Sequence, residues 1–295
     1  MSQTIKLALG SIVVAIGVLA LKFWAARITG SVALLSYALE SIVNLATAIT
    51  ALVAVRLAAR PADAALPYGY HKAEYFSAVI EGVFIVVAAL LIFYQAWQGF
   101  VSPRLLDAPV EGIALSLLAS AVNGAWCWIL IREGRRLASP ALEADGHHLW
   151  TDVLSSIGVV AGLVLVIVTG QPVLDALLAA LVGLNILWSG SRLVARSVGG
   201  LMDVAVPKAR MEEIRAAIAA NAEGAIEAHD LRTRQAGKAT FIDFHLVVPG
   251  TMSVDDAHTI CDRIEAALRA ISTEALITIH VEPEDKAKHT GIVVL

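Results

Sequence analysis

The chain has 295 residues, of which 58% are hydrophobic and only 16% charged, and its mean hydropathy is +0.73. Ordinary soluble domains carry about a quarter charged residues, so the composition excludes that class, and a formal net charge of −4 gives no reason to expect nucleic acid as a partner. The two cysteines, Cys127 and Cys261, lie far apart in the sequence, which excludes a disulfide framework and a zinc finger.

Six apolar stretches fill the first two thirds of the chain, and each has the length of about 20 residues that a membrane-spanning helix needs. Short polar or turn-forming segments separate them. The first follows MSQTIK without a cleavage-like site, so we expect it to be retained as a span. The stretches cover residues 7–28, 31–55, 76–100, 110–131, 147–169 and 173–195.

Basic residues orient this array of spans. Only Arg27 and Arg104 lie at one set of span ends, whereas the other set holds Lys6, Arg56, Arg60, Lys72, Arg132, Arg135, Arg136, Arg192 and Arg196. Since positive charge favours the cytoplasmic side, the pattern predicts that both termini are cytoplasmic. Lys22 and Glu81 lie within spans, where we expect snorkelling or a structural ion pair.

After Pro207 the pattern becomes that of a soluble domain. Amphipathic helices alternate with β-like segments, and Ser253, with Asp256 three residues later, suits the cap of the second helix. The expected helix, two strands, helix and strand cover residues 209–223, 225–235, 238–249, 253–271 and 275–283. This α-β-β-α-β order predicts a small sheet with helices on one face. We therefore expect a six-helix transmembrane domain over 1–205 and a cytoplasmic α+β domain over 206–295.

Ionisable residues open the fifth span. His148 and Asp152 are four residues apart, so a helix places them on one face, which Asp145 shares. Glu40 and Asn44 repeat the spacing in the second span. Such residues inside a membrane usually mark a pathway or a partner, and one imidazole, two carboxylates and an amide oxygen suit a borderline divalent cation. Isolated interhelical hydrogen bonds are the alternative, above all for Asn44.

A second group of candidate ligands lies in the soluble domain. His280 and Glu282 are two residues apart in a predicted strand and so face the same side. Three more histidines stand beside apolar sheet or helix positions in the same domain, namely His229, His245 and His258. Single histidines at such places are usually ordinary surface residues, but four with a carboxylate indicate a metal cluster.

At these residues the chain resembles the cation diffusion facilitator family, which exports zinc and related divalent metals. The resemblance covers nearly the whole chain and implies six spans followed by a metallochaperone-like cytoplasmic domain. It depends on the motifs GSVALLSYALESIVN, PYGYHKAEYFSAVIEG, ADGHHLWTDVLSSIGVVAG, LMDVAVP and HDLRTRQAG.

The resemblance implies that Glu40, Asn44, His148 and Asp152 form the transport site. The fifth-span pair matches the family, whereas the second-span pair departs from the commoner Asp–Asp or His–Asp. Asn44 contributes a neutral oxygen, so the site has one negative charge fewer than the Asp–Asp version. Zn²⁺ suits these ligands, and Fe²⁺, Co²⁺, Ni²⁺, Mn²⁺ and Cd²⁺ stay open.

In the cytoplasmic domain the resemblance implies a two-metal site, partly shared across a homodimer. Its ligands are His229, His245, His258, His280 and Glu282, with Glu282 as the bridging acid where Asp is typical. The resemblance also implies that this site binds Zn²⁺ or another divalent metal as a regulatory ligand.

Two further positions follow from the resemblance. Lys72 matches a lysine that pairs with an aspartate after the last span, here Asp203, to lock the dimer. Some relatives also bind metal in the loop between the second and third spans through an Asp and two His. The matching positions here are Asp63, Leu66 and Tyr70, with His71 displaced by one. That loop site therefore looks degenerate.

Together these features predict an exporter of divalent metal, chiefly Zn²⁺, that exchanges its cargo for protons across a bacterial inner membrane. His148, Asp152 and Glu40 must lose protons to bind a cation, so metal binding releases protons. Rocking of helices would then expose the site to alternate sides. A passive channel and a metal sensor are the alternatives. A membrane metalloenzyme is disfavoured because no acid follows His148 as in H-E-x-x-H, so we expect no enzymatic activity.

Overall fold

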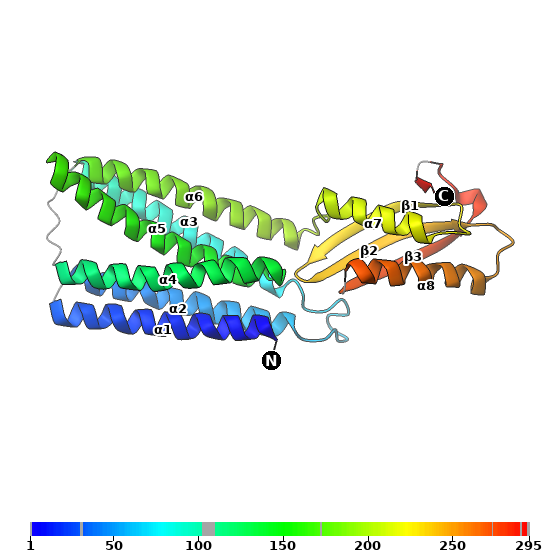
Figure 1. Ribbon diagram of the computed structural model, residues 1–295, viewed down its shortest axis with the longest axis horizontal. Helices are drawn as coiled ribbons and strands as arrows, with labels where there is room; N and C mark the ends of the chain where they lie inside the picture. Colours follow the sequence, from blue (N-terminus) through cyan, green and yellow to red (C-terminus); the bar gives the residue numbers. More distant parts are fainter. Residues whose placement is uncertain are drawn as a thin grey trace. The chain divides into compact units, whose positions relative to one another are not determined.

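The computed structural model describes residues 2–29, 32–101, 110–171, 173–272, 274–289 and 291–293. The chain divides into two compact units, Met1–Val198 and Gly199–Leu295. The first unit is helical and the second combines helices with a sheet (Figure 1).

The first unit contains the six long helices that hydropathy predicts. Each has 27 to 30 residues, more than the roughly 20 needed to cross a bilayer. They are α1 Gln3–Thr29, α2 Val32–Ala58, α3 Ala73–Val101, α4 Val110–Arg136, α5 Pro140–Thr169 and α6 Val173–Leu201. Within the described residues, α1, α3 and α6 are long and apolar enough to cross a membrane by length and composition alone.

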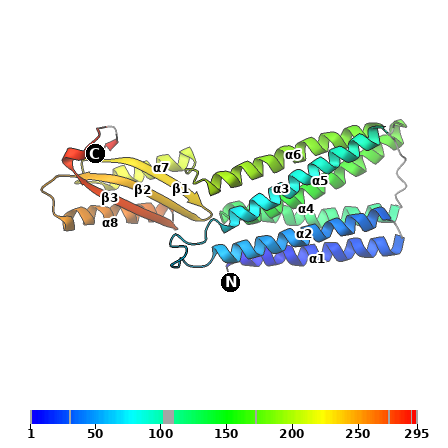
Figure 2. The same ribbon diagram turned by 180° about the vertical axis from the view of Figure 1, so that it is seen from behind.

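The helices form two groups, which Figures 1 and 2 show from opposite sides. Helices α1, α2 and α4 lie together, and α3, α5 and α6 lie together. Helix α5 joins the groups because it packs against both α4 and α3. Gly146 makes the contact with α4 very close, since a Cβ atom there would lie 2.6 Å from a carbon of the Ile131 side chain.

Helix α5 begins earlier than the apolar pattern predicts. Residues 132–145 read as a polar break, but α4 continues to Arg136 and α5 begins at Pro140. Proline suits the first turn of a helix because its missing N–H has no partner there. Asp145 is consequently inside α5, on the turn before His148, in agreement with its predicted place on the same helix.

The second unit confirms the predicted α-β-β-α-β order and adds a short fourth strand. Its elements are α7 Lys208–Asn221, β1 Glu227–Ala236, β2 Ala239–Val248, α8 Val254–Ile271, β3 Ala275–Pro283, the 3₁₀ turn η1 Glu284–Lys286 and β4 Ile292–Val293. The strand order is β3-β2-β1-β4, with β2 parallel to β3 and β1 antiparallel to β2 and β4. Strand β4 has only two residues, too few to show a period.

Both helices cover one face of this sheet, as predicted. Ile242, Phe244 and Leu246 alternate along β2 and are fully buried against α7 and α8. The Ser253 hydroxyl accepts a hydrogen bond from the backbone N–H of Asp256, which confirms the predicted cap of α8. Since side chains alternate across a strand, the histidines of the strands lie on the opposite face, which Figure 2 shows in front.

Replacing Phe244 by Ala is expected to destabilise the second unit by about 3–5 kcal/mol, because the ring is fully buried and leaves a cavity. Pulse proteolysis of the full-length protein in increasing urea measures this change. Val254→Ala is the control, since Val254 is 88% exposed and should shift stability by less than about 0.5 kcal/mol. Equal midpoints for the two variants would contradict this assignment of the core.

Candidate metal centres

The first candidate centre lies where α2 packs against α5 in the helical unit, Met1–Val198. Nε2 of His148 lies 3.0 Å from Oδ1 of Asn44, and Nδ2 of Asn44 donates a hydrogen bond to Oδ2 of Asp152. The structure thus brings together three of the four predicted transport ligands. Glu40 belongs to α2, but its side chain lies outside the described residues.

One ring nitrogen of His148, Nδ1, makes no hydrogen bond to the described residues. Asn44 and His148 are both buried. Asp145, one helical turn earlier, is buried and hydrogen-bonded to Ser11 of α1. Its other carboxylate oxygen, Oδ2, is buried and has no hydrogen-bond partner among the described residues.

Glu81 is also buried in this unit, so snorkelling, which is one of the two roles expected for it, is wrong. Its side chain has no exposed area, and it accepts a hydrogen bond of 3.0 Å from the Ser77 hydroxyl one turn away on α3. The apolar pattern places Glu81 near the start of a span, from which its side chain could reach water. Packing of α3 against α5 and α6 closes that route.

The second candidate centre is a row of histidines on the open face of the sheet. Strand register places His229 of β1 opposite His245 of β2, and His245 opposite His280 of β3. The ring centroids are 5.3 Å apart in the first pair and 4.9 Å in the second. Three predicted ligands from three strands are therefore neighbours.

Glu282 lies among these three imidazoles. Its carboxylate oxygens lie 3.2 Å from Nε2 of His229, 3.1 Å from Nδ1 of His245 and 3.7 Å from Nε2 of His280. The first two nitrogens are buried, yet they lack a hydrogen bond of good geometry to any described residue. Buried polar atoms are rarely left in this state. Nitrogen and carboxylate atoms directed at a common point fit a divalent metal such as Zn²⁺.

Glu227 supports this row and was missed in the sequence. Its Oε1 lies 2.9 Å from Nδ1 of His229, and it accepts hydrogen bonds from the backbone N–H groups of Lys288 and His289. Burial raises the pKa of Glu227, but these hydrogen bonds outweigh it and hold the pKa below its usual value. The carboxylate is thus charged at neutral pH and fixes the His229 ring with Nε2 toward Glu282. Its spacing of two residues from His229 was the available signal.

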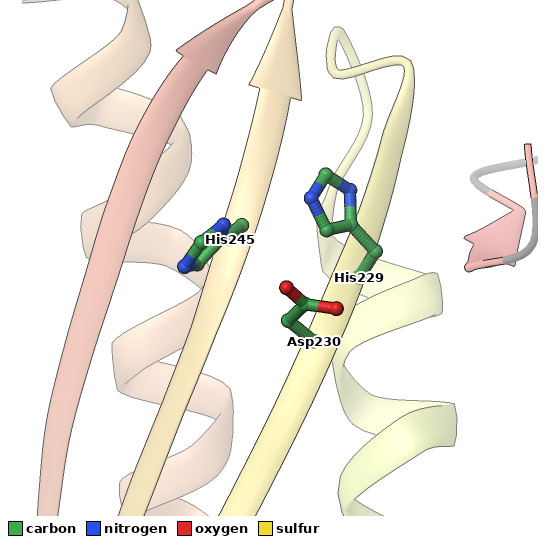
Figure 3. Close-up of side chains that lie close together, drawn as sticks. All are labelled: His229, Asp230 and His245. Carbon is green, nitrogen blue, oxygen red and sulfur yellow. The ribbon is translucent and has the colours of Figure 1, made fainter. Parts of the chain in front are cut away.

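Asp230 is a second acid that the sequence did not single out. It lies at a bulge of β1 with a positive φ of 53°, and its ligand atom lies within 4.8 Å of those of His229 and His245. Figure 3 shows the three side chains together. Lys288 already pairs with Asp230 at 2.6 Å, whereas Glu282 contacts three imidazoles. Glu282 is therefore the stronger candidate ligand.

His258 lies apart from the row within one chain. It is on α8, on the other side of the sheet, with 72% of its side chain exposed and Nε2 lying 3.6 Å from Oδ1 of Asp262. The predicted sharing of the site across a homodimer stays a prediction.

The loop after α2 uses its carboxylate for its own structure. Asp63 accepts hydrogen bonds from the Tyr70 hydroxyl at 2.6 Å and from the backbone N–H groups of Ala65 and Leu66. The bond from Tyr70 is the main reason that the pKa of Asp63 is lowered. The predicted degeneracy of the loop site stays a prediction.

The two residues of the predicted dimer lock belong to different units. Lys72 directly precedes α3, and Asp203 lies after α6, where its carboxylate accepts a hydrogen bond of 3.0 Å from Nη1 of Arg234. The pairing of Lys72 with Asp203 stays a prediction.

Comparison with known proteins matches two family models to this architecture. The cation efflux transmembrane domain matches residues 8–202, and the cation efflux protein cytoplasmic domain matches residues 206–284. An uncharacterized transporter of Synechocystis is 48% identical, covering 94% of this chain and 90% of that protein. The cation-efflux pump FieF of Yersinia enterocolitica is 35% identical, covering 94% and 91%.

Solved structures also match about a quarter of the chain. The zinc form of CzrB is 45% identical, covering 28% of this chain and 96% of that one, with a TM-score of 0.28. The metal-bound C-terminal domain of the CzcD transporter from Thermotoga maritima is 26% identical, covering 28% and 100%, with a TM-score of 0.26.

Proposed function

The chain belongs to the cation efflux family, the cation diffusion facilitators, and on this premise we propose that it exports Zn²⁺ from the cytoplasm in exchange for protons. The observation that carries the proposal is the contact of Asn44 with both His148 and Asp152 inside the helical unit. An imidazole with carboxylate and amide oxygens suits Zn²⁺, and Fe²⁺, Co²⁺, Ni²⁺, Mn²⁺ and Cd²⁺ are alternative cargo. We assign no enzymatic activity.

Exchange follows from ligands that bind either kind of ion. His148 and Asp152, with Glu40 as the expected fourth ligand, bind metal only when deprotonated, so loading metal releases protons. When the site faces the more acidic side, protons displace the metal. Helices that move as rigid bodies change which side has access. Asn44 cannot take up a proton in this range and serves only as an oxygen donor.

The row of histidines on the open face of the sheet would bind metal, and the bound metal would regulate transport. His229, His245, His280 and Glu282 supply the ligands in one chain, with His258 as the ligand expected from a second copy. We propose a homodimer in a bacterial inner membrane with both termini cytoplasmic, locked by Lys72 and Asp203. The domain boundary between residues 205 and 206 is part of this proposal.

Zinc flux into proteoliposomes tests the function. With an acidic lumen, uptake reported by a luminal zinc dye should rise as the pH gradient is made steeper. A rate of zinc uptake that does not depend on the pH gradient would indicate a passive channel. If none of the candidate metals entered the vesicles, a metal sensor would be the remaining alternative.

Glu282→Ala is expected to lower the metal content of the purified protein and weaken the apparent affinity for transport by roughly 10-fold, while flux at saturating zinc persists. The carboxylate contacts three imidazoles but lies outside the helical unit. His258→Ala should act in the same direction if a second copy completes the site. Elemental analysis per chain, together with flux against zinc concentration, measures both effects.

Glu284→Ala is the matched control, since Glu284 is an exposed acid two residues away. It should leave metal content and affinity unchanged. Loss of all flux in a folded Glu282→Ala protein would contradict a regulatory role.

A further inference from the structure

A basic cavity lies between α5 and α6 beside the end of α4, within the helical unit. Its volume is about 380 Å³, and Arg135, Arg192 and Arg196 line it together with a single carboxylate, Glu143. None of these residues belongs to the transport ligands described above. A cavity rich in arginine repels cations, so it is a poor site for a metal ion and suits an anionic occupant.

The arginines keep more positive charge than Glu143 can neutralise. Oε1 of Glu143 lies 2.9 Å from Nη1 of Arg196 and 3.3 Å from Nε of Arg135. No ion pair with Arg192 is found in the described part of the chain. Three guanidinium groups thus face one carboxylate, which leaves an excess of two positive charges. Each guanidinium carries five N–H donors in a planar fork that matches phosphate oxygens.

The residues around the cavity are of the kinds found at a membrane interface. The placement of the cavity rests on the proposed function, in which the domain after α6 is cytoplasmic, so that the C-terminal end of α6 and the cavity beside it are on the cytoplasmic side. Trp150 and Trp188 also line the cavity and are exposed, and tryptophan is enriched at membrane interfaces. Basic pockets between transmembrane helices on this side are known to hold anionic headgroups.

An apolar stripe continues from the cavity along α6. Leu177, Leu181, Leu184 and Trp188 are spaced four, three and four residues apart, and each is more than half exposed. This spacing places them on one side of the helix. Trp188 belongs to both the stripe and the cavity. A free phosphate would use only the arginines, whereas a phospholipid would use the arginines and the stripe.

We propose that this cavity binds the phosphate headgroup of an anionic phospholipid, with its acyl chains lying along the stripe on α6. The lipid would bridge Arg135 of α4, Arg192 and Arg196 of α6 and the adjoining part of α5. Helix α5 carries His148 and Asp152 a few residues further on, so a bound lipid would also stiffen the frame of the transport site.

Binding to the delipidated full-length protein tests the proposal independently of transport. Native mass spectrometry and thermal unfolding would compare phosphatidylglycerol, phosphatidylcholine and inorganic phosphate as added ligands. Only phosphatidylglycerol should stay bound and raise the unfolding temperature. Arg192→Gln and the double variant with Arg196→Gln should weaken this binding by roughly fivefold for each arginine removed.

Arg132→Gln is the matched control, because Arg132 lies near the same end of α4 but stacks over Trp128 outside the cavity. It should bind phosphatidylglycerol as the unmodified protein does. Equal effects of phosphatidylcholine or of inorganic phosphate would overturn the proposal, as would unchanged binding in the Arg192→Gln variant. The double variant also removes the Arg196–Glu143 ion pair and so could fail to fold. In that case the binding measured for Arg192→Gln alone tests the proposal.

Discussion

Asp152→Ala is expected to reduce zinc flux to the level of protein-free vesicles. The substitution deletes a carboxylate that can bind the cation and accept a proton, and it removes the acceptor of the Asn44 amide. Of the proposed ligands, only Glu40 would then carry negative charge, and one carboxylate cannot balance a divalent cation or exchange it for the same number of protons. Flux of a zinc dye in proteoliposomes at a fixed pH gradient measures the effect.

Two further variants separate chemistry from folding. Asp152→Asn keeps the size of the side chain but not its charge, so it should be as inactive as Asp152→Ala. Ser155→Ala is the matched control on the same helix, since the Ser155 hydroxyl donates a hydrogen bond of 3.0 Å to the Thr151 carbonyl oxygen of its own helix and forms no hydrogen bond with the described transport ligands. It should transport normally. Full-rate transport by either Asp152 variant would mean that the site is elsewhere.

Asn44→Asp is expected to hold metal more tightly but release it more slowly. In the unmodified protein the amide N–H₂ faces the Asp152 carboxylate. An aspartate would instead place two carboxylates in contact, which cannot both stay ionised without a cation. Protons should therefore compete harder for the empty site, moving the pH optimum upward by about one unit. The extra anionic oxygen should also favour a harder ion such as Mn²⁺.

Flux of Zn²⁺, Fe²⁺ and Mn²⁺ against pH measures this change. Asn44→Ala is the control, because it removes both contacts of the amide without adding charge and should only weaken transport. If Asn44→Asp left metal preference and pH profile unchanged, Asn44 would be a helix-packing amide rather than a ligand.

The sequence predicts those features of the fold that depend on local pattern. Apolar runs give the six helices, and Ser253 with Asp256 gives the start of α8. The start of α5 at Pro140 was missed, because hydropathy reports where lipid begins and not where helical hydrogen bonding begins. Strand β4 depends on pairing with the distant strand β1 and leaves no local signal.

In the candidate sites too, the sequence predicts what depends on local spacing and not what depends on the packing of distant segments. Spacing alone places His148 and Asp152 on one face of α5, but the position of Asn44 between them depends on how two helices pack. In the sheet, alternation predicts that His280 and Glu282 share a face. The approach of Glu282 to His229 depends on a register across three strands, which no single segment encodes.

The central claim is that one site exchanges divalent metal for protons. It is tested most directly by adding Zn²⁺ outside vesicles that contain a pH dye, with no imposed pH gradient and with K⁺ and valinomycin holding the membrane potential at zero. Zinc entry should drive protons out and make the lumen alkaline, and Asp152→Ala should abolish both movements. Zinc entry without any change in luminal pH would contradict the claim.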